Sequence, residues 1–232
     1  MRCAHILRAL SSVQKYNTIL FMHFDINDTL YSLPGIVIGL TLHEYCHALA
    51  AYKLGDGTAK ADGRLTFDPL KHIDPIGFLF IVIAGFGWAK PVSFDERNLA
   101  HPRRDRILIA LAGPLSNLVL GIVSLYVVKL LRLAGVQISS LPLFAVYKTV
   151  FYALLYTATI NLGLFIFNIL PIPPLDGSHV FFSGMNLSKE KEARFMQWGT
   201  FALFALIAAE RATGIDFIPI GAFVNKVVSL VL

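Results

Sequence analysis

Long runs of apolar residues, separated by polar stretches, dominate the pattern of this sequence. Three of the runs reach the length of about 20 residues that a helix needs to cross the hydrocarbon core of a bilayer. These runs are Ser32–Tyr52, Ile107–Leu131 and Lys148–Leu170. The pattern therefore predicts an all-α fold, a polytopic membrane helix bundle built around a three-helix core.

The remaining apolar stretches are shorter. Ile73–Trp88 is interrupted by Pro75 and three glycines, which predicts a re-entrant or hairpin element rather than a full span. Phe195–Ala209 predicts a short accessory span, and Phe217–Leu232 a final helix that need not span. Met1–Met22 is basic at scattered positions and lacks a clear apolar core and cleavage site, so we expect an amphipathic or poorly inserted segment rather than a signal peptide.

Composition supports a membrane protein. Of the 232 residues, 56% are hydrophobic and only 15% are charged, whereas soluble domains carry about 25% charged residues. The net charge of +5 could suggest a nucleic-acid partner, but the basic residues cluster beside the apolar runs. The tendency of basic loops to remain cytoplasmic explains them more simply, so no nucleic acid is expected.

Charge also predicts the topology. The basic segments are Lys53–Lys71, Lys90–Arg106 and Lys189–Arg194, whereas the linker Leu133–Tyr147 has no charged residue. If Ile73–Trp88 only dips into the membrane, all three basic segments fall on one face, which the positive-inside rule makes cytoplasmic. We expect one domain, residues 1–232, crossing the plasma or inner membrane several times.

The candidate chemistry lies in the first long run, at His43-Glu44-Tyr45-Cys46-His47. Histidines four residues apart share one helix face, so both imidazoles can bind one zinc ion while Glu44 beside them acts as a base. Each charge at the centre of a membrane helix costs about 2.5 to 3.5 kcal/mol, so a functional site is favoured over an accidental match. Cys46 points about 100° away from His47 and is interpreted as a packing residue.

Two glycines continue the pattern of the histidines. Gly35, Gly39, His43 and His47 recur every four residues on one helix face. Small residues at this spacing let another backbone come close. Ordinary helix packing would explain the stripe, although we favour a wall where the zinc-bearing helix meets its partner or substrate.

Asp176 is the candidate third ligand, because catalytic zinc takes three protein ligands and keeps a fourth position open. It is the only acidic residue between Asp105 and Glu190, and three prolines break the chain just before it. The freed backbone could turn its carboxylate inward. A turn role for Asp176-Gly177 is the alternative, but the zinc motif favours the ligand.

Two asparagines in apolar runs are candidate substrate contacts. Asn117 and Asn168 could donate to a developing oxyanion or hold an extended substrate backbone. Hydrogen bonding between helices is an equal alternative for Asn117, and it is the role we expect for Asn161.

The ordered motifs resemble the site-2 proteases, a family of intramembrane zinc metalloproteases. The motifs are His43-Glu44-x-x-His47, Gly113-Pro114-x-x-Asn117 and Asn168-x-x-Pro171-x-Pro173-x-x-Asp176-Gly177. The stretch from Gly63 to Pro75 resembles the small prokaryotic branch of the family, and no PDZ or CBS module is visible.

The resemblance implies a catalytic core of about residues 32–177, with accessory terminal helices at 195–232. It implies one zinc ion per chain and a transmembrane protein substrate that is locally unwound and cut within the bilayer. The residues implied are the ligands His43, His47 and Asp176, the general base Glu44, and the substrate contacts Asn117 and Asn168. His179 stands where the family more often has Arg, and it could approach the metal or reach the membrane surface.

Two other functions use the same residues. A membrane transporter or ion carrier could employ the His, Glu and Asp side chains as a proton or metal relay. A catalytically silent scaffold would ordinarily have lost Glu44 or a ligand, and neither is lost here. We therefore predict an intramembrane zinc endopeptidase, with its active site nearer the cytoplasmic face and its oligomeric state left open.

Overall fold

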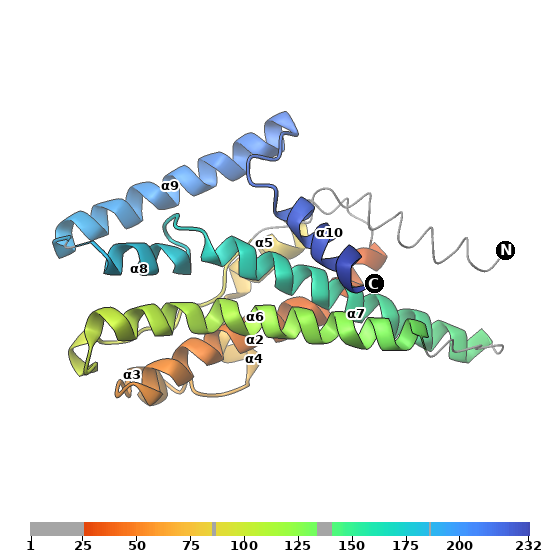
Figure 1. The fold of residues 1–232 in the computed structure, drawn as a ribbon, viewed down its shortest axis with the longest axis horizontal. Helices are drawn as coiled ribbons and strands as arrows, with labels where there is room; N and C mark the ends of the chain where they lie inside the picture. The colour runs from red at the N-terminus through yellow and green to blue at the C-terminus, as the bar shows by residue number, and fades with distance from the viewer. Residues whose placement is uncertain (1–25, 85–86, 134–140, 186) are drawn as a thin grey trace.

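The computed structural model describes residues 26–84, 87–133, 141–185 and 187–232 (Figure 1). Over these residues the chain is helical, and the only extended pairing is an isolated antiparallel bridge between Ile73 and Ala89. The predicted all-α fold is confirmed. The amphipathic segment expected at Met1–Met22 lies outside the described residues.

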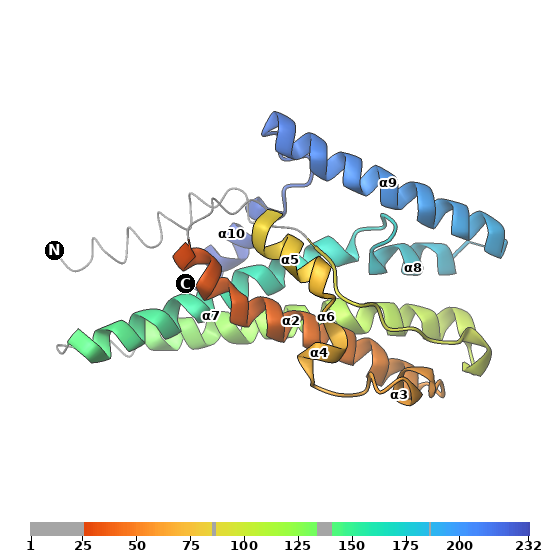
Figure 2. The same ribbon diagram turned by 180° about the vertical axis from the view of Figure 1, so that it is seen from behind.

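Three long helices form the centre of the molecule: α2 (Ile26–Lys53), α6 (Pro102–Leu133) and α7 (Leu141–Ile169). Helices α2 and α6 contain the apolar runs predicted for them, and α7 contains its run except for Leu170; all three begin several residues before the run. Helices α6 and α7 lie side by side, and α2 packs against both (Figures 1 and 2). The expected three-helix core is therefore present.

Two helices among the described residues are long and apolar enough to cross a membrane. They are α6, with 32 residues, and the part of α7 from Leu143 to Ile169, with 27 residues. Large apolar side chains such as Leu115 and Val119 are exposed on α6, where lipid tails can cover them. Helix α2, which carries His43, Glu44 and His47, is not one of these two helices and packs against both of them.

Helix α10 (Ile220–Val231) completes the packing of α6 and α7. Its buried Val224 and Val228 join one apolar cluster with Leu125 of α6 and Leu162 of α7. With 12 residues it is about 18 Å long, well short of the roughly 30 Å of a bilayer core. It therefore packs against the bundle without being long enough to span.

Helix α5 (Pro75–Ala84) has the geometry of the expected hairpin. Its ten residues rise about 15 Å, or roughly half of the bilayer core. The Ile73–Ala89 bridge and a hydrogen bond from the Lys90 N–H to the His72 carbonyl (2.7 Å) bring the chain back to its starting point. The short helices α3 (Thr58–Ala61), α4 (Pro69–His72) and η1 (Glu96–Asn98) lie in the polar segments on either side.

The last part of the chain holds α8 (Asp176–Ser183) and α9 (Lys189–Thr213). Helix α9 contains the apolar run Phe195–Ala209, for which a short accessory span was expected, and extends beyond this run at both ends. The Ser188 hydroxyl accepts a hydrogen bond from the Lys191 N–H at the start of α9, and Gly214 ends the helix in the left-handed region (φ 68°).

Candidate metal centre

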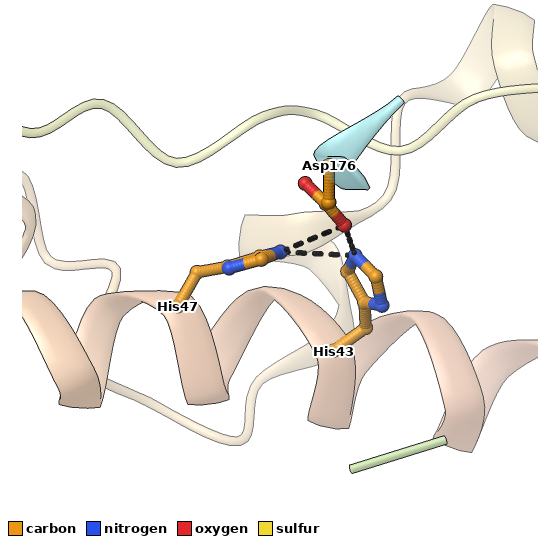
Figure 3. Close-up of side chains that lie close together, drawn as sticks. All are labelled: His43, His47 and Asp176. Carbon is orange, nitrogen blue, oxygen red and sulfur yellow. Dashed lines mark hydrogen bonds and ion pairs between the residues drawn. The ribbon is translucent and has the colours of Figure 1, made fainter. Parts of the chain in front are cut away.

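His43 and His47 lie one turn apart on α2 and turn their rings toward the same point (Figure 3). Their Nε2 atoms are 3.0 Å apart and the ring planes meet at 80°. Both side chains are buried, with 7% and 8% of their surface exposed. The spacing of four residues therefore has the effect expected from the sequence, which is to bring two imidazole nitrogens together.

Asp176, the first residue of α8, completes the group (Figure 3). Its Oδ2 lies 3.1 Å from the Nε2 of His43 and 3.4 Å from the Nε2 of His47. This oxygen is buried and has no hydrogen-bond partner, as expected of an atom that faces a cation. Among the described residues, these three form a group that could hold a metal ion.

The separations fit a zinc ion. Two ligand atoms bound at about 2.0–2.1 Å to one tetrahedral zinc lie roughly 3.3 Å apart. The three measured separations, 3.0, 3.1 and 3.4 Å, fall around this value. Two imidazoles and one carboxylate are also a ligand set used by catalytic zinc, which leaves the fourth position open.

A second set of contacts orients each ring. The Nδ1 of His47 lies 2.7 Å from the Ile109 carbonyl, and the Nδ1 of His43 lies 2.6 Å from the Oδ1 of Asn117. Because both partners are acceptors, each ring carries its hydrogen on Nδ1, which leaves the lone pair of Nε2 free to bind a metal ion. Neither partner could be assigned from the zinc motif alone.

The position of Asn117 corrects one expectation. Its side chain is completely buried, and its amide nitrogen donates to the Gly39 carbonyl and to Asn161. With its oxygen bonded to His43, the amide has no free group to offer a substrate or an oxyanion. The alternative of hydrogen bonding between helices describes Asn117 correctly.

Two glycines provide space at this site, Gly113 beside the two imidazole rings and Gly177 in the turn before Asp176. A Cβ atom on Gly113 of α6 would lie 2.3 Å from the Nε2 of His47 and 2.7 Å from that of His43. A Cβ atom on Gly177 would lie 2.2 Å from the Ile169 carbonyl oxygen, where the chain turns to place Asp176. In the sequence, only their places in the Gly113-Pro114 and Asp176-Gly177 motifs indicated that these glycines belong to the site.

Glu44 stands beside the ligands and is 7% exposed. Its Oε2 accepts a hydrogen bond from the backbone N–H of Val92 (3.0 Å), in the extended segment that follows α5. The carboxylate is thus held in place at the site, as a general base must be. The Val92 contact has no signal in the sequence, because it is made by a backbone group 48 positions away.

A cavity of about 420 Å³ opens beside these residues. His43 and Glu44 line it from α2, Ala89 from the segment after α5, Asn168 from α7, and Phe204 from α9. The other lining side chains are mainly apolar. Asn168 is half-buried and its amide donates to the Leu164 carbonyl, so its oxygen is available to a molecule in the cavity. Asn168 therefore lies at the wall of this cavity.

His179 does not belong to the candidate metal-binding group and bonds to Arg106 instead. Its Nδ1 accepts a hydrogen bond from Arg106 (2.8 Å), whose guanidinium also pairs with Glu192 of α9 and with Glu96 (3.2 Å). This network joins the start of α6 to α8 and α9. Cys46 is half-buried and does not belong to the metal-binding group found among the described residues.

The chain was compared with known proteins. Residues 31–210, which include His43, Glu44, His47 and Asp176, match Peptidase family M50. No solved structure matches the chain.

Several similar proteins carry the name "Putative zinc metalloprotease". YwhC of Bacillus subtilis is 39% identical over 160 residues, which cover 69% of this chain and 71% of YwhC. Rip2 of Mycobacterium tuberculosis is 31% identical over 150 residues, which cover 62% of this chain and 53% of Rip2. MJ0611 of Methanocaldococcus jannaschii is 29% identical over 161 residues, which cover 69% of this chain and 73% of MJ0611.

Proposed function

The chain belongs to peptidase family M50 and is a zinc metallopeptidase, and we propose that it cleaves peptide bonds within the membrane-spanning segments of other membrane proteins. The family match agrees with the resemblance to the site-2 proteases, and it does not favour the alternative of a transporter or ion carrier. One observation carries the proposal: ligands from two distant segments converge beside Glu44 and an apolar cavity.

We assign His43, His47 and Asp176 as the ligands of one zinc ion per chain. When bound, zinc supplies a Lewis acid that polarises the scissile carbonyl and lowers the pKa of a coordinated water toward about 7. Glu44 takes the proton of the attacking water and passes it to the leaving amine. The Val92 N–H holds its Oε2, which leaves Oε1 to accept the proton.

The cavity supports an extended, apolar substrate. A helix keeps its carbonyl groups in internal hydrogen bonds, so the scissile stretch must unwind to present one to the site. Ala89 pairs with Ile73 on one side and lines the cavity, so an unwound substrate can add to the chain there as an extra strand. The Oδ1 of Asn168 is placed to accept a hydrogen bond from its backbone.

The distribution of charge supports the proposed topology. Helix α3, the start of α6 and the start of α9 lie at the same end of the bundle (Figure 1). These three regions contain the basic segments, and the ion pair of Arg106 with Glu192 joins two of them. The positive-inside rule makes this end cytoplasmic. His47 lies about 9 Å along α2 from Lys53, and this distance supports a zinc site below the membrane surface, nearer this face.

The test compares Glu44→Gln with Glu190→Gln, a matched change at an exposed residue of α9. We expect wild type and both variants to bind one zinc ion per chain, because neither residue is a ligand. Glu44→Gln should accumulate an uncut membrane protein in the membrane proteome, and lower its cleavage in detergent by a factor of about 10²–10⁴. Glu190→Gln should cleave normally.

Three results would contradict the proposal. Undiminished cleavage by Glu44→Gln would exclude Glu44 as the general base. Less than one zinc ion per wild-type chain would contradict the proposed metal centre. A cut site outside the membrane-spanning segment of the substrate, located by mass spectrometry, would leave a zinc peptidase but refute cleavage within the membrane.

A further inference from the structure

Asn161 of α7 is a completely buried amide to which the proposed chemistry gives no role. We propose that Asn161 is a positioning residue of the metal centre, which acts through Asn117 to hold His43 in the tautomer that binds zinc. The inference rests on the proposed zinc site, and it adds two residues from other helices to the machinery that the site requires.

The orientation of Asn161 is determined by backbone groups. Its Nδ2 lies 3.1 Å from the Gly35 carbonyl oxygen and 2.8 Å from the Thr157 carbonyl oxygen. A carbonyl can only accept, so the NH₂ group must face these two atoms. The Oδ1 of Asn161 must then face the other way, where the Nδ2 of Asn117 lies 2.8 Å away.

This contact passes the orientation on to Asn117. The Nδ2 of Asn117 faces two acceptors, the Oδ1 of Asn161 and the Gly39 carbonyl (3.1 Å). Its Oδ1 therefore faces the Nδ1 of His43, 2.6 Å away. Since an oxygen there accepts only from an N–H, His43 carries its hydrogen on Nδ1 and keeps the Nε2 lone pair for the metal.

Comparison with His47 shows why His43 needs this relay. The Nδ1 of His47 bonds to the backbone carbonyl of Ile109, which cannot exchange a donor for an acceptor. The partner of His43 is a side-chain amide, and such an amide can rotate to present NH₂ instead of oxygen. With Asn161 in place, that rotation would set the Asn117 oxygen against two acceptors inside a buried interface.

The glycine stripe of α2 allows the relay to form. A Cβ atom on Gly39 would lie 2.3 Å from the Oδ1 of Asn161, and one on Gly35 would lie 2.6 Å from the Cα of Thr157. Only glycine at these positions lets α2 and α7 approach closely enough for Asn161 to reach a carbonyl on the neighbouring helix. The partner that the stripe meets is thus α7.

The experiment measures zinc affinity, by chelator competition on the full chain in detergent, in a double-mutant cycle. Leu replaces Asn161, Asn117 or both, because Leu is close in size to Asn and cannot hydrogen-bond. We expect Asn161→Leu to weaken zinc binding about 10-fold, the lower end of the range for groups that orient a ligand. In the Asn117→Leu background, the same change should have no further effect on zinc affinity.

Two further variants separate the relay from packing. Thr157→Val alters a buried hydroxyl of the same interface that bonds to the Ala153 carbonyl, so it should lower the unfolding temperature without changing zinc affinity. Asn161→Asp, protonated in this buried site, keeps a carbonyl oxygen that accepts from Asn117 and an O–H that can donate to one of the two backbone carbonyls, so it should bind zinc more tightly than Asn161→Leu does. If Asn161→Leu does not fold, Asn161→Asp takes its place in the cycle. Its effect on zinc affinity is then measured once with Asn117 present and once in the Asn117→Leu background.

The outcomes distinguish the relay from the zinc site itself. Zinc affinity that is unchanged by the Asn161 variants, or that falls equally in both Asn117 backgrounds, would overturn the relay while the metal centre stands. A wild-type chain that binds no zinc would overturn the metal centre and the relay together.

Discussion

Replacing Gly113 by Ala is expected to weaken zinc binding by at least about 100-fold while the helix bundle stays folded. The added Cβ atom would lie 2.3 Å from the Nε2 of His47 and 2.7 Å from that of His43. Ordinary contact requires about 3.5 Å, so the His47 ring would have to retreat by about 1 Å. Zinc–ligand distances tolerate only about 0.2 Å, so the displaced ring can no longer bind.

The expected loss of zinc affinity is at least 100-fold, or about 2.7 kcal/mol, because a change to a ligand must exceed the 10- to 100-fold effect of altering the groups around it. The intrinsic helix preference of Ala over Gly, about 1 kcal/mol, acts in the opposite direction on folding and helps the helix persist. The variant should therefore be helical and inactive.

The measurements are zinc stoichiometry on the purified full chain, circular dichroism and peptidase activity. Gly121→Ala is the matched control, because Gly121 lies on the same helix and its Cβ would meet the Leu162 side chain, 2.9 Å away, rather than a ligand. We expect the control to lose some stability and to keep its zinc. A Gly113→Ala chain that binds zinc as tightly as the wild type would refute the geometry of the site.

Two other predictions concern the polar end of the bundle and the cavity. The pKa of Asp56, in the loop after α2, is lowered because hydrogen bonds from Thr58, Asn98 and the Asp95 N–H outweigh the opposing effect of burial. A lowered pKa contributes stability above the unfolded value that is lost as the pH falls below about 4. Asp56→Asn should thus cost about 1–3 kcal/mol at neutral pH and progressively less in acid, as measured by thermal unfolding; a pH-independent difference would contradict this. Asn168→Leu should keep stoichiometric zinc and lower kcat/KM by about 10-fold, as the loss of one hydrogen bond to the substrate backbone, about 0.5–1.5 kcal/mol, does, and an unchanged kcat/KM would exclude Asn168 from the substrate site.

Local patterns in the sequence were sufficient for the main parts of the fold and for the choice of three residues that lie together as a candidate metal-binding group. The four-residue spacing of His43 and His47 determines that both rings share one helix face, whatever the helix packs against. Two of the three long apolar runs likewise lie in helices that are long and apolar enough to cross a bilayer, whereas α2, which carries His43, Glu44 and His47, is not one of these helices. Helix ends were less predictable, because Ser188 and Gly214 cap α9 outside its apolar run.

The tertiary structure decided which groups surround those residues. Asn117 could face a substrate or another helix, and only the rotation of α6 against α2 directs it to His43, 74 positions earlier. The same packing brings Gly113 against the ligands, Val92 to Glu44, and Asn161 to Asn117. Periodicity specifies which side chains share one helix face, but the relative rotation and separation of helices depend on contacts spread over the whole bundle, and no local pattern contains them.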